Sequence, residues 1–426
     1  MLLTSHNTHT HTHTHTLSLL PLFRWKMPQP TVFRRRTNFD LPDEIVLEIL
    51  TRLPVKSVLR FRCVCKSWYS YITNPNFIST HLNSSLSHNH GYVIYMRKTF
   101  PRYYSSSHSQ VCTVSCDRTF ERVSEFRIPF TFQSGLPRLV GSCNGILCFT
   151  DFIVSEFNGV YLWNPSIRKF KKLPDTCLSR LHHAKLGFGY DSLNNDYKVV
   201  RISRSRVKVM PPLEVEVYTL SSDSWKRIGL GIRWRPNVVF WKINCFLLSP
   251  FVSGHLHWMF LYVEDRGGRE RRFTHTILSF DVNSEKFKEL PLPDDEGICI
   301  SIYLTSFKGK LALIKFRYGV QSCDALCCIW VMREYGVFDS WNKLCVVPVE
   351  GTYNIIGFTK YDLLLIRRRP QLVSTNSELE REVKSVLIDP ETLHENEISI
   401  PVDNRLDLAT HMESLALLDG ENVVSY

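Results

Sequence analysis

The chain has 426 residues, of which 44% are hydrophobic and 12% aromatic, and its formal net charge is +11 at pH 7. This length exceeds the size at which one compact core usually stops growing, so we expect a small module joined to a larger, repetitive domain. The positive charge does not by itself indicate a nucleic-acid-binding protein, because no known nucleic-acid-binding module surrounds the basic residues.

The first 39 residues predict no folded structure. Residues 8–16 alternate threonine and histidine, as a translated CACACA repeat would, so a start at Met27 is an alternative. Metal binding by this tract is the weaker interpretation, because nothing fixes the ligand geometry. Residues 17–23 are short and lack the flanks of a signal peptide, and no run of about 18 uncharged apolar residues occurs. We expect a disordered segment over residues 1–39, no secretion and no contact with a membrane.

An amphipathic helix is predicted directly after this segment. Pro42 suits a first helical turn, where its missing N–H would have no partner, and Asp43 complements the positive end of the helix dipole. Apolar residues then recur at helical spacing until Pro54 ends the pattern: Ile45, Val46, Ile49, Leu50 and Leu53. Two further short helices are predicted over residues 56–62 and 65–73. Three helices in about 40 residues cannot bury all these side chains, so a partner or the next domain must cover them.

The residues of this helical module resemble the F-box of plant F-box proteins. The resemblance rests on the runs Leu41-Pro-Asp-Glu-Ile45, Ile49-Leu50, Arg52-Leu-Pro-Val-Lys-Ser57 and Leu59-Arg-Phe-Arg-Cys-Val-Cys-Lys-Ser-Trp68. It implies an F-box domain over residues 40–82 that binds a Skp1-like adaptor and, through it, a cullin and a RING subunit. The resemblance places the adaptor contacts at Leu41, Pro42, Ile45, Ile49, Leu53, Pro54, Leu59, Val64 and Trp68. Cys63 and Cys65 fit as small buried contacts. An ordinary helical cap on the following domain is the alternative.

Beyond Asn83 the pattern changes to short apolar runs separated by Gly, Pro, Asn, Asp and Ser, which is typical of β-strands. A glycine-containing turn that enters a buried strand recurs at residues 141–149, 253–260 and 307–314. A strand, a polar turn, an aromatic residue and a closing Leu-Pro or similar end recur at residues 160–174, 215–228, 277–291 and 329–344, and more weakly at 386–393. Such repetition indicates units whose cores are completed by their neighbours.

The spacing of the repeats predicts a β-propeller. The aromatic landmarks Phe170, Trp225, Phe287 and Trp341 fall 55, 62 and 54 residues apart, close to the roughly 50 residues of a four-stranded kelch-type blade. A first blade over residues 91–129 and a last over 357–401 give about six blades. The apolar run over residues 414–418 is predicted to supply a strand that closes the ring, since an open apolar edge would invite aggregation. A frayed tail is the alternative.

The repeats also resemble the F-box-associated interaction domain that follows many plant F-boxes. The resemblance rests on residues 141–148, 162–174, 187–200 and 330–337, and with the F-box it covers most of residues 41–418. It implies an α+β multidomain protein in which residues 91–418 form a kelch-like β-propeller that captures a protein substrate. The chain departs from compact relatives in basic insertions around residues 201–210 and 267–272. We interpret the basic cluster of the first, Arg201, Arg204, Arg206 and Lys208, as a solvated strand or loop face.

The two resemblances together imply a non-catalytic substrate-recognition adaptor of an SCF-type (Skp1–cullin–F-box) ubiquitin ligase. Such an adaptor promotes ubiquitination and proteasomal degradation by holding a target close to the transfer machinery. An F-box scaffold that does not direct degradation is one alternative, and a propeller enzyme with residues scattered over its blades is another. The sequence contains no Gly-x-Ser-x-Gly elbow, phosphate-binding loop or His-Glu-x-x-His motif, so we predict no catalytic residue and no cofactor.

The histidines and cysteines do not predict a metal site. His182-His183 lies in a polar connection, and His255-x-His257 alternates along a strand without matching carboxylates or cysteines, so we expect structural histidines. The thirteen cysteines are an odd set that matches neither paired zinc knuckles nor a disulfide framework. They predict reduced core residues in a protein of the nucleus or the cytoplasm.

Overall fold

The computed structural model describes residues 41–88, 91–97, 110–132, 137–151, 159–176, 181–205, 213–232, 238–239, 247–265, 271–293, 299–318, 325–349, 352–369, 383–398, 400, 406–416 and 423–426. The segment predicted to be disordered, residues 1–39 with the alternative start at Met27, lies outside these ranges. Among the described helices, none combines the length and the apolar composition needed to cross a membrane.

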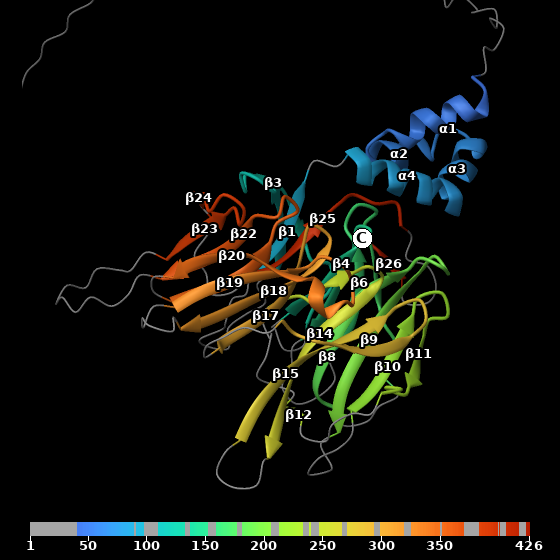
Figure 1. The fold of residues 1–426 in the computed structure, drawn as a ribbon. Helices are drawn as coiled ribbons and strands as arrows, with labels where there is room; N and C mark the ends of the chain where they lie inside the picture. The colour runs from blue at the N-terminus through green and yellow to red at the C-terminus, as the bar shows by residue number, and fades with distance from the viewer. Residues whose placement is uncertain are drawn as a thin grey trace, which may run out of the picture. The chain divides into compact units, whose positions relative to one another are not determined.

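Four helices form the N-terminal part, α1 (Asp43–Thr51), α2 (Val55–Phe61), α3 (Lys66–Thr73) and α4 (Pro75–His88), as Figure 1 shows. The first three confirm the predicted helices, whereas α4 was not predicted. The third helix ends at Thr73, before Asn74-Pro75, as predicted, but proline also suits the first turn of a new helix. The Asn74 side-chain oxygen accepts the Asn76 N–H at 2.8 Å and so caps α4.

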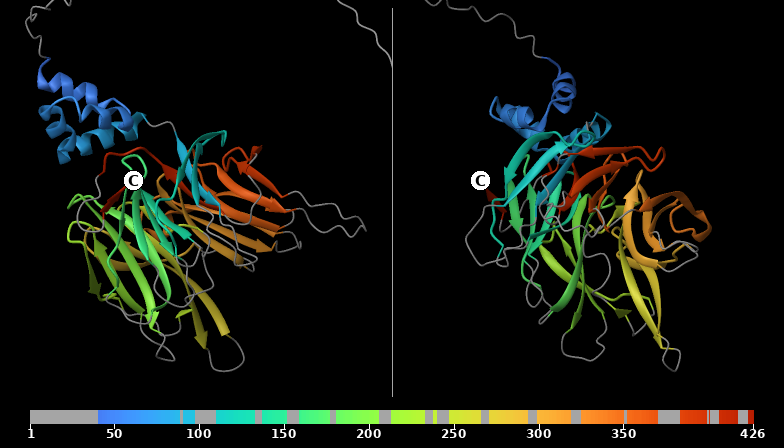
Figure 2. Two further views of the ribbon diagram at one scale, coloured as in Figure 1. Left: turned by 180° about the vertical axis from the view of Figure 1, so that it is seen from behind. Right: turned by 90° about the vertical axis from the view of Figure 1, so that its left-hand side faces the viewer.

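Six antiparallel sheets follow, each a blade of a propeller (Figures 1 and 2). Blade 1 holds β1 (Tyr92–Arg97), β2 (Val111–Cys116) and β3 (Arg122–Arg127), and blade 2 holds β4 (Pro137–Cys143), β5 (Ile146–Asp151), β6 (Val160–Asn164) and β7 (Lys169–Lys172). Blade 3 holds β8 (Leu181–Asp191), β9 (Asp196–Ser205), β10 (Leu213–Thr219) and β11 (Ser224–Ile228). The predicted six-bladed propeller is therefore confirmed.

Blade 4 holds β12 (Val238–Val239), β13 (Phe251–Val252), β14 (His255–Asp265), β15 (Arg271–Asp281) and β16 (Lys286–Leu290). Blade 5 holds β17 (Cys299–Phe307), β18 (Lys310–Tyr318), β19 (Ala325–Met332) and β20 (Trp341–Val349), with a 3₁₀ turn at Phe338–Ser340. Blade 6 holds β21 (Thr352–Phe358), β22 (Leu364–Arg369), β23 (Lys384–Ile388) and β24 (Glu395–Ile398). The four aromatic landmarks lie on the strands β7, β11, β16 and β20, which confirms the repeat.

The strand that closes the ring is not the predicted one. β25 (Leu406–His411) pairs along its whole length with β1 and completes blade 1, so the first blade joins the two ends of the propeller. In the predicted closing run, Ser414, Leu415 and Ala416 are buried but do not form a strand, and residues 417 and 418 lie outside the described residues. A further strand, β26 (Val423–Ser425), pairs with β7 and makes blade 2 five-stranded. Apolar character alone did not distinguish a packed loop from a strand.

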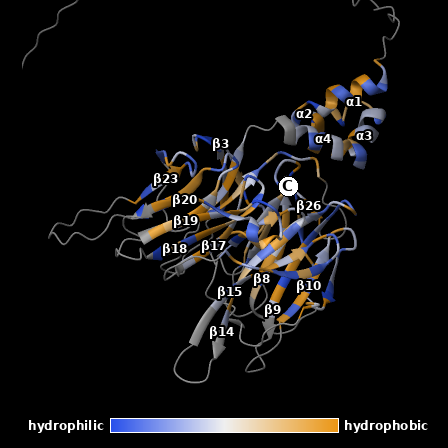
Figure 3. Ribbon diagram, in the orientation of Figure 1, coloured by the Kyte–Doolittle hydropathy of each residue, from blue (hydrophilic) through white to orange (hydrophobic). Residues whose placement is uncertain are grey.

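Among the described residues, six apolar clusters each lie between two neighbouring blades, and a smaller one contains Phe307, Ala312 and Val331 of blade 5. Alternate residues of one strand enter different clusters: Val93 and Tyr95 of β1 pack against blade 6, whereas Ile94 and Met96 pack against blade 2. Both faces of a central strand are thus buried, which explains the unbroken apolar runs of residues 93–96 in β1 and 326–332 in β19. Figure 3 shows hydrophobic residues on many strands of the blades, mixed with hydrophilic ones on strands such as β10.

Tryptophans of the repeat tie successive blades together. The Trp225 indole N–H on β11 donates to the Pro174 carbonyl of blade 2 at 2.8 Å, and the Trp341 N–H on β20 donates to the Pro291 carbonyl of blade 4 at 3.0 Å. Each acceptor is the proline of a repeat-closing Leu-Pro pair. The aromatic residue and the Leu-Pro end of the sequence repeat therefore form one contact across a blade interface.

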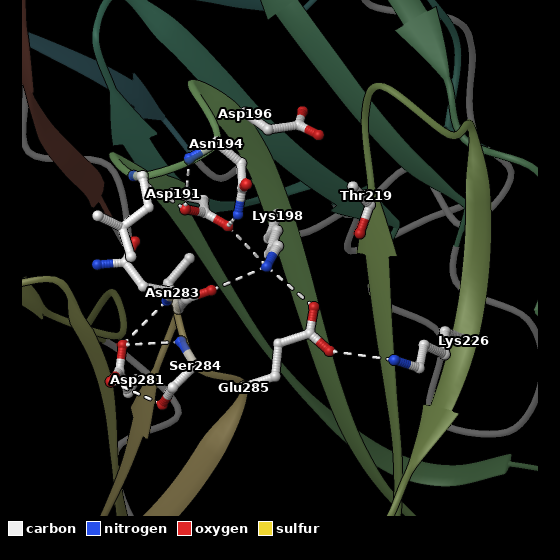
Figure 4. A network of polar contacts seen from close by, with 12 residues as sticks. Asp191, Asn194, Asp196, Lys198, Thr219, Lys226, Asp281, Asn283, Ser284 and Glu285 are labelled. Carbon is white, nitrogen blue, oxygen red and sulfur yellow. Dashed lines mark hydrogen bonds and ion pairs between the residues drawn. The ribbon is translucent and has the colours of Figure 1, made fainter.

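A buried ammonium group joins blades 3 and 4. Lys198 Nζ of β9 lies 2.8 Å from the Asp191 carboxylate of its own blade and 2.9 Å from Glu285 of blade 4, and it donates to the Val282 carbonyl at 2.9 Å (Figure 4). The Ser192 N–H donates to the Asn283 side-chain oxygen between the same two turns at 3.1 Å. The three acceptors around Lys198 satisfy a charge that would otherwise be costly to bury.

Candidate partner-docking site

Helix α1 exposes apolar side chains along one side. Ile45 and Ile49 are one turn apart and are 47% and 48% exposed, whereas Leu50 is 1% exposed. Leu41, directly before the helix, is 56% exposed, and Pro42 is also exposed. Surface helices normally turn such residues inward, because burying an isoleucine side chain stabilises a protein by about 1.5–3 kcal/mol. These apolar side chains are therefore open to solvent on the described chain.

The segment around α2 and α3 presents a second set of predicted contacts. Val64, between these helices, is 59% exposed, and Pro54 is exposed as well. Leu53, Leu59 and Trp68 are half-buried, and the Trp68 ring packs edge-on against Phe61 with the ring centres 5.5 Å apart. Half-buried side chains of this kind hold their neighbours in place and still offer apolar surface to a partner.

Tyr69 belongs with the exposed apolar residues of this module but was not predicted. It is 52% exposed, and the Arg62 guanidinium lies 5.1 Å from the centre of its ring. The sequence signal was its position: Trp68 and Ile72 mark the inward side of α3, and Tyr69 falls outside that spacing. Cys63 and Cys65 are exposed rather than buried, and the Cys65 sulfur accepts the Trp68 N–H at 3.5 Å at the start of α3.

A small internal core holds these helices. Leu50, Val55, Val58, Ile72 and Phe77 are each at most 6% exposed. His81 of α4 is also buried, and its Nε2 lies within hydrogen-bonding distance of the Leu53 carbonyl, at 2.9 Å. The unpredicted α4 thus supports the chain next to two of the predicted contacts, Leu53 and Pro54. The module is therefore a packed support for the exposed side chains, which agrees with a docking role.

Among the histidines predicted to be structural, His257 has the contacts of a structural residue. His257 is fully buried, with Nδ1 3.1 Å from the Pro250 carbonyl and Nε2 2.7 Å from the Tyr335 hydroxyl. The Tyr335 oxygen also lies 2.7 Å from Ser279 Oγ. The side chains of His182 and His183 lie outside the described residues. Within the described part of the chain, no cluster of three or more His, Cys, Asp or Glu residues could hold a metal ion.

Two buried histidines, His257 and His411, and the half-buried His275 predict a propeller that loses stability in acid. Burial lowers the pKa of His257 to about 3 and those of His275 and His411 to about 4. Below the ordinary histidine pKa of about 6.5 the unfolded chain gains protons that the folded chain cannot accept, so stability falls as the pH drops toward 4. We expect His257 and His411 each to contribute a loss of roughly 2 kcal/mol at pH 5.

Urea unfolding measured between pH 7.5 and pH 5 checks this expectation. His411→Gln should give a shallower fall in unfolding free energy with decreasing pH, and the same change at the exposed His394 serves as the control. An equally steep fall in the two variants would contradict it.

The interpretation of the basic cluster as a solvated face is wrong for Arg201. This residue on β9 is 4% exposed, its guanidinium lies 3.7 Å from the Glu216 carboxylate, and it sits 4.7 Å from the centre of the Trp225 ring. The carboxylate and the ring make burial of the charge tolerable. Arg206 and Lys208 lie outside the described residues. Because both partners are distant in sequence, the local charge pattern could not reveal this burial.

Family models match the two parts of the chain separately. The F-box domain model matches residues 39–80, and the model of the F-box associated beta propeller domain matches residues 93–404. An F-box/kelch-repeat protein of Arabidopsis thaliana is 31% identical over 322 residues, which are 72% of this chain and 80% of the relative. One F-box protein of the same plant is 29% identical, in a match that covers 74% of this chain and 73% of the relative. Another is 27% identical, in a match that covers 81% of this chain and 91% of the relative. An F-box indicates a Skp1-type partner in general. The chain therefore belongs to the plant F-box proteins that carry an F-box-associated β-propeller domain.

Proposed function

We propose that this protein is a substrate-recognition adaptor of an SCF-type ubiquitin ligase. The observation that supports the proposal most directly is the exposure of Leu41, Ile45, Ile49 and Val64 on a packed helical module. Apolar side chains held on short helices are the anchors that a groove on a partner recognises. The propeller would hold a protein target, and the attached cullin and RING subunits would then bring the ubiquitin-carrying enzyme close to it.

The proposed mechanism requires no catalytic group in this chain. An adaptor raises the effective concentration of the target lysine at the transfer enzyme, so its contribution is proximity. The captured protein would then be ubiquitinated and degraded by the proteasome. We also propose a location in the nucleus or the cytoplasm, where thiols stay reduced.

Exchanging one exposed anchor for a charge tests adaptor binding. We expect Ile49→Asp to weaken binding to a plant Skp1-like protein about 30-fold or more, because a carboxylate would be buried without a partner in the complex. Isothermal titration calorimetry with the full chain measures the dissociation constant. The matched control is Leu193→Asp, which introduces the same charge in place of an apolar propeller residue that is 79% exposed.

Unchanged binding by both variants would show that α1 does not contact the adaptor. Equal weakening by both would show that the effect is not specific to the F-box. Reconstitution with cullin, RING subunit and ubiquitin-carrying enzyme then tests the second half of the proposal, since a captured target should become ubiquitinated only when Ile49 is intact.

A further inference from the structure

The outer edge of blade 2 is covered by the C-terminal strand of the chain. β26 adds to the outer edge of β7, with Val423 opposite Lys171, Val424 opposite Phe170 and Ser425 opposite Lys169. Figure 1 shows β26 and the C-terminus beside this blade. The Tyr426 N–H continues the ladder by donating to the Arg168 carbonyl at 3.3 Å. The other five blades end in a four-residue or longer outer strand with no fifth strand beyond it among the described residues.

A specific polar contact lies at the end of this β7 edge. Trp163 of β6 has no exposed surface, and its indole N–H donates to the Tyr426 hydroxyl at 2.9 Å. The ring of Phe170 lies 6.5 Å from the ring of Tyr426, measured between centres. Losing the hydroxyl would leave a buried N–H without an acceptor, which costs about 1–3 kcal/mol. The site therefore selects an aromatic residue that carries a hydrogen-bond acceptor.

The other side of β26 supplies an apolar contact. Val423 packs against the cluster between blades 2 and 3, which contains Leu162 and Tyr218, whereas Val424 is 45% exposed. Side chains of a strand alternate between its two faces, so Val423 and Tyr426 contact different faces of the blade. Strand addition combined with alternate side-chain pockets is a general mode of peptide recognition.

The strand is held less firmly than the segment before it. Ser414, Leu415 and Ala416 are at most 5% exposed, and both the Ser414 and the Ala416 carbonyls accept from the buried Asn164 amide, at 3.1 and 2.9 Å. A Cβ on Gly145, whose φ is +79°, would lie 2.3 Å from Ser414 Cβ, so this segment is tightly fitted. By contrast, Val424 and Tyr426 remain 45% and 47% exposed. Residues 414–416 are thus clamped by buried contacts, whereas Val424 and Tyr426 keep nearly half of their surface exposed.

We infer that the outer edge of β7, with Trp163 at its end, is a peptide-binding groove that the C-terminal strand occupies and can vacate. Its ligand is an extended segment with a β-branched residue facing the blade 2–3 cluster and a tyrosine three positions later. In the resting protein, residues 423–426 are that ligand, and a partner segment of the same chemistry would replace them. This inference concerns blade 2 and stands independently of adaptor binding by the helices.

Peptide binding to full-length variants tests the inference. The probe is a fluorescent peptide with the sequence of residues 421–426, and fluorescence anisotropy gives its affinity. Val423→Asp should release β26 and bind the peptide at least about tenfold more tightly than the unaltered protein, because its carboxylate would lie against the apolar cluster between blades 2 and 3. Val424→Asp, at the exposed neighbouring position, is the matched control and should behave like the unaltered protein. A peptide with phenylalanine in place of tyrosine should bind about tenfold more weakly.

Two results would overturn the inference. One is a folded Val423→Asp protein, shown by near-ultraviolet circular dichroism, that does not bind the peptide. The other is an unaltered protein that binds it equally well. If Val423→Asp does not fold, amide hydrogen exchange of the unaltered protein tests the inference instead. The amides of Val424, Ser425 and Tyr426 should then exchange at least about tenfold faster than the amides of β5. Equally slow exchange would show a permanent strand.

Discussion

Ending the chain after Asn404 is expected to abolish the folded propeller. This change removes β25, whose Leu406, Leu408 and Ala409 are buried against blades 6 and 2. It also removes the Asp407 carboxylate, which accepts the Leu139 N–H at 3.0 Å. Each lost leucine costs about 1.5–3 kcal/mol, and β1 is left with an unpaired edge. The sum approaches the whole stability of a typical domain, about 5–15 kcal/mol.

Thermal unfolding followed by circular dichroism, with size-exclusion chromatography, measures this effect. A chain that ends after Glu421 is the matched control, because it loses β26 but keeps β25 and the clamped residues 414–416. The control should unfold cooperatively with a melting temperature only a few degrees lower. A cooperative transition near the original temperature in the shorter chain would show that β25 does not close the ring.

Replacing Lys198 by methionine is expected to lower the free energy of unfolding by about 3–5 kcal/mol. The substitution removes the ammonium group that lies 2.8 Å from Asp191 and 2.9 Å from Glu285, and it leaves the fully buried Asp191 carboxylate without its cation. Methionine preserves the volume of the side chain, so the loss reports the charge rather than a cavity. Urea unfolding at pH 7 gives the free energy.

Lys226 offers a matched control at the same carboxylate. Its ammonium lies 3.7 Å from Glu285 but is 73% exposed, so Lys226→Ala should change stability by less than about 1 kcal/mol. The double change Lys198→Met with Asp191→Asn should recover part of the loss, since it neutralises the stranded carboxylate. Equal losses in Lys198→Met and Lys226→Ala would show that burial does not strengthen this contact.

The same contact should be insensitive to pH over a wide range. Burial raises the pKa of Asp191, but hydrogen bonds from Asn194 and Lys198 outweigh it and hold that pKa below its ordinary value. The pKa of Lys198 is raised, since its contacts with Asp191 and Glu285 outweigh burial. The stability that the Asp191 carboxylate contributes is lost only as the pH falls through its lowered pKa. The stability that the Lys198 ammonium contributes is lost only as the pH rises through its raised pKa. The acid sensitivity expected near pH 5 therefore belongs to the buried histidines.

The sequence by itself determined the class of the protein, since the signals involved are local. Helical spacing up to Pro54 and the anchor residues of the F-box predicted α1 to α3, because helix start and stop depend on a few neighbouring side chains. The repeat of an apolar strand, a polar turn, an aromatic residue and Leu-Pro predicted the blades, because each blade is one short antiparallel unit.

Only the tertiary structure decided features that depend on residues far apart in the chain. The choice of β25 over residues 414–418 as the closing strand rests on its pairing with β1, more than 300 positions earlier. Burial of Arg201 rests on Glu216 and Trp225, and burial of Lys198 rests on Glu285. The local sequence of a strand indicates its apolar character but not the strand with which it pairs. The pairing depends on the geometry of the closed ring, in which strand edges need partners and buried charges need counter-charges.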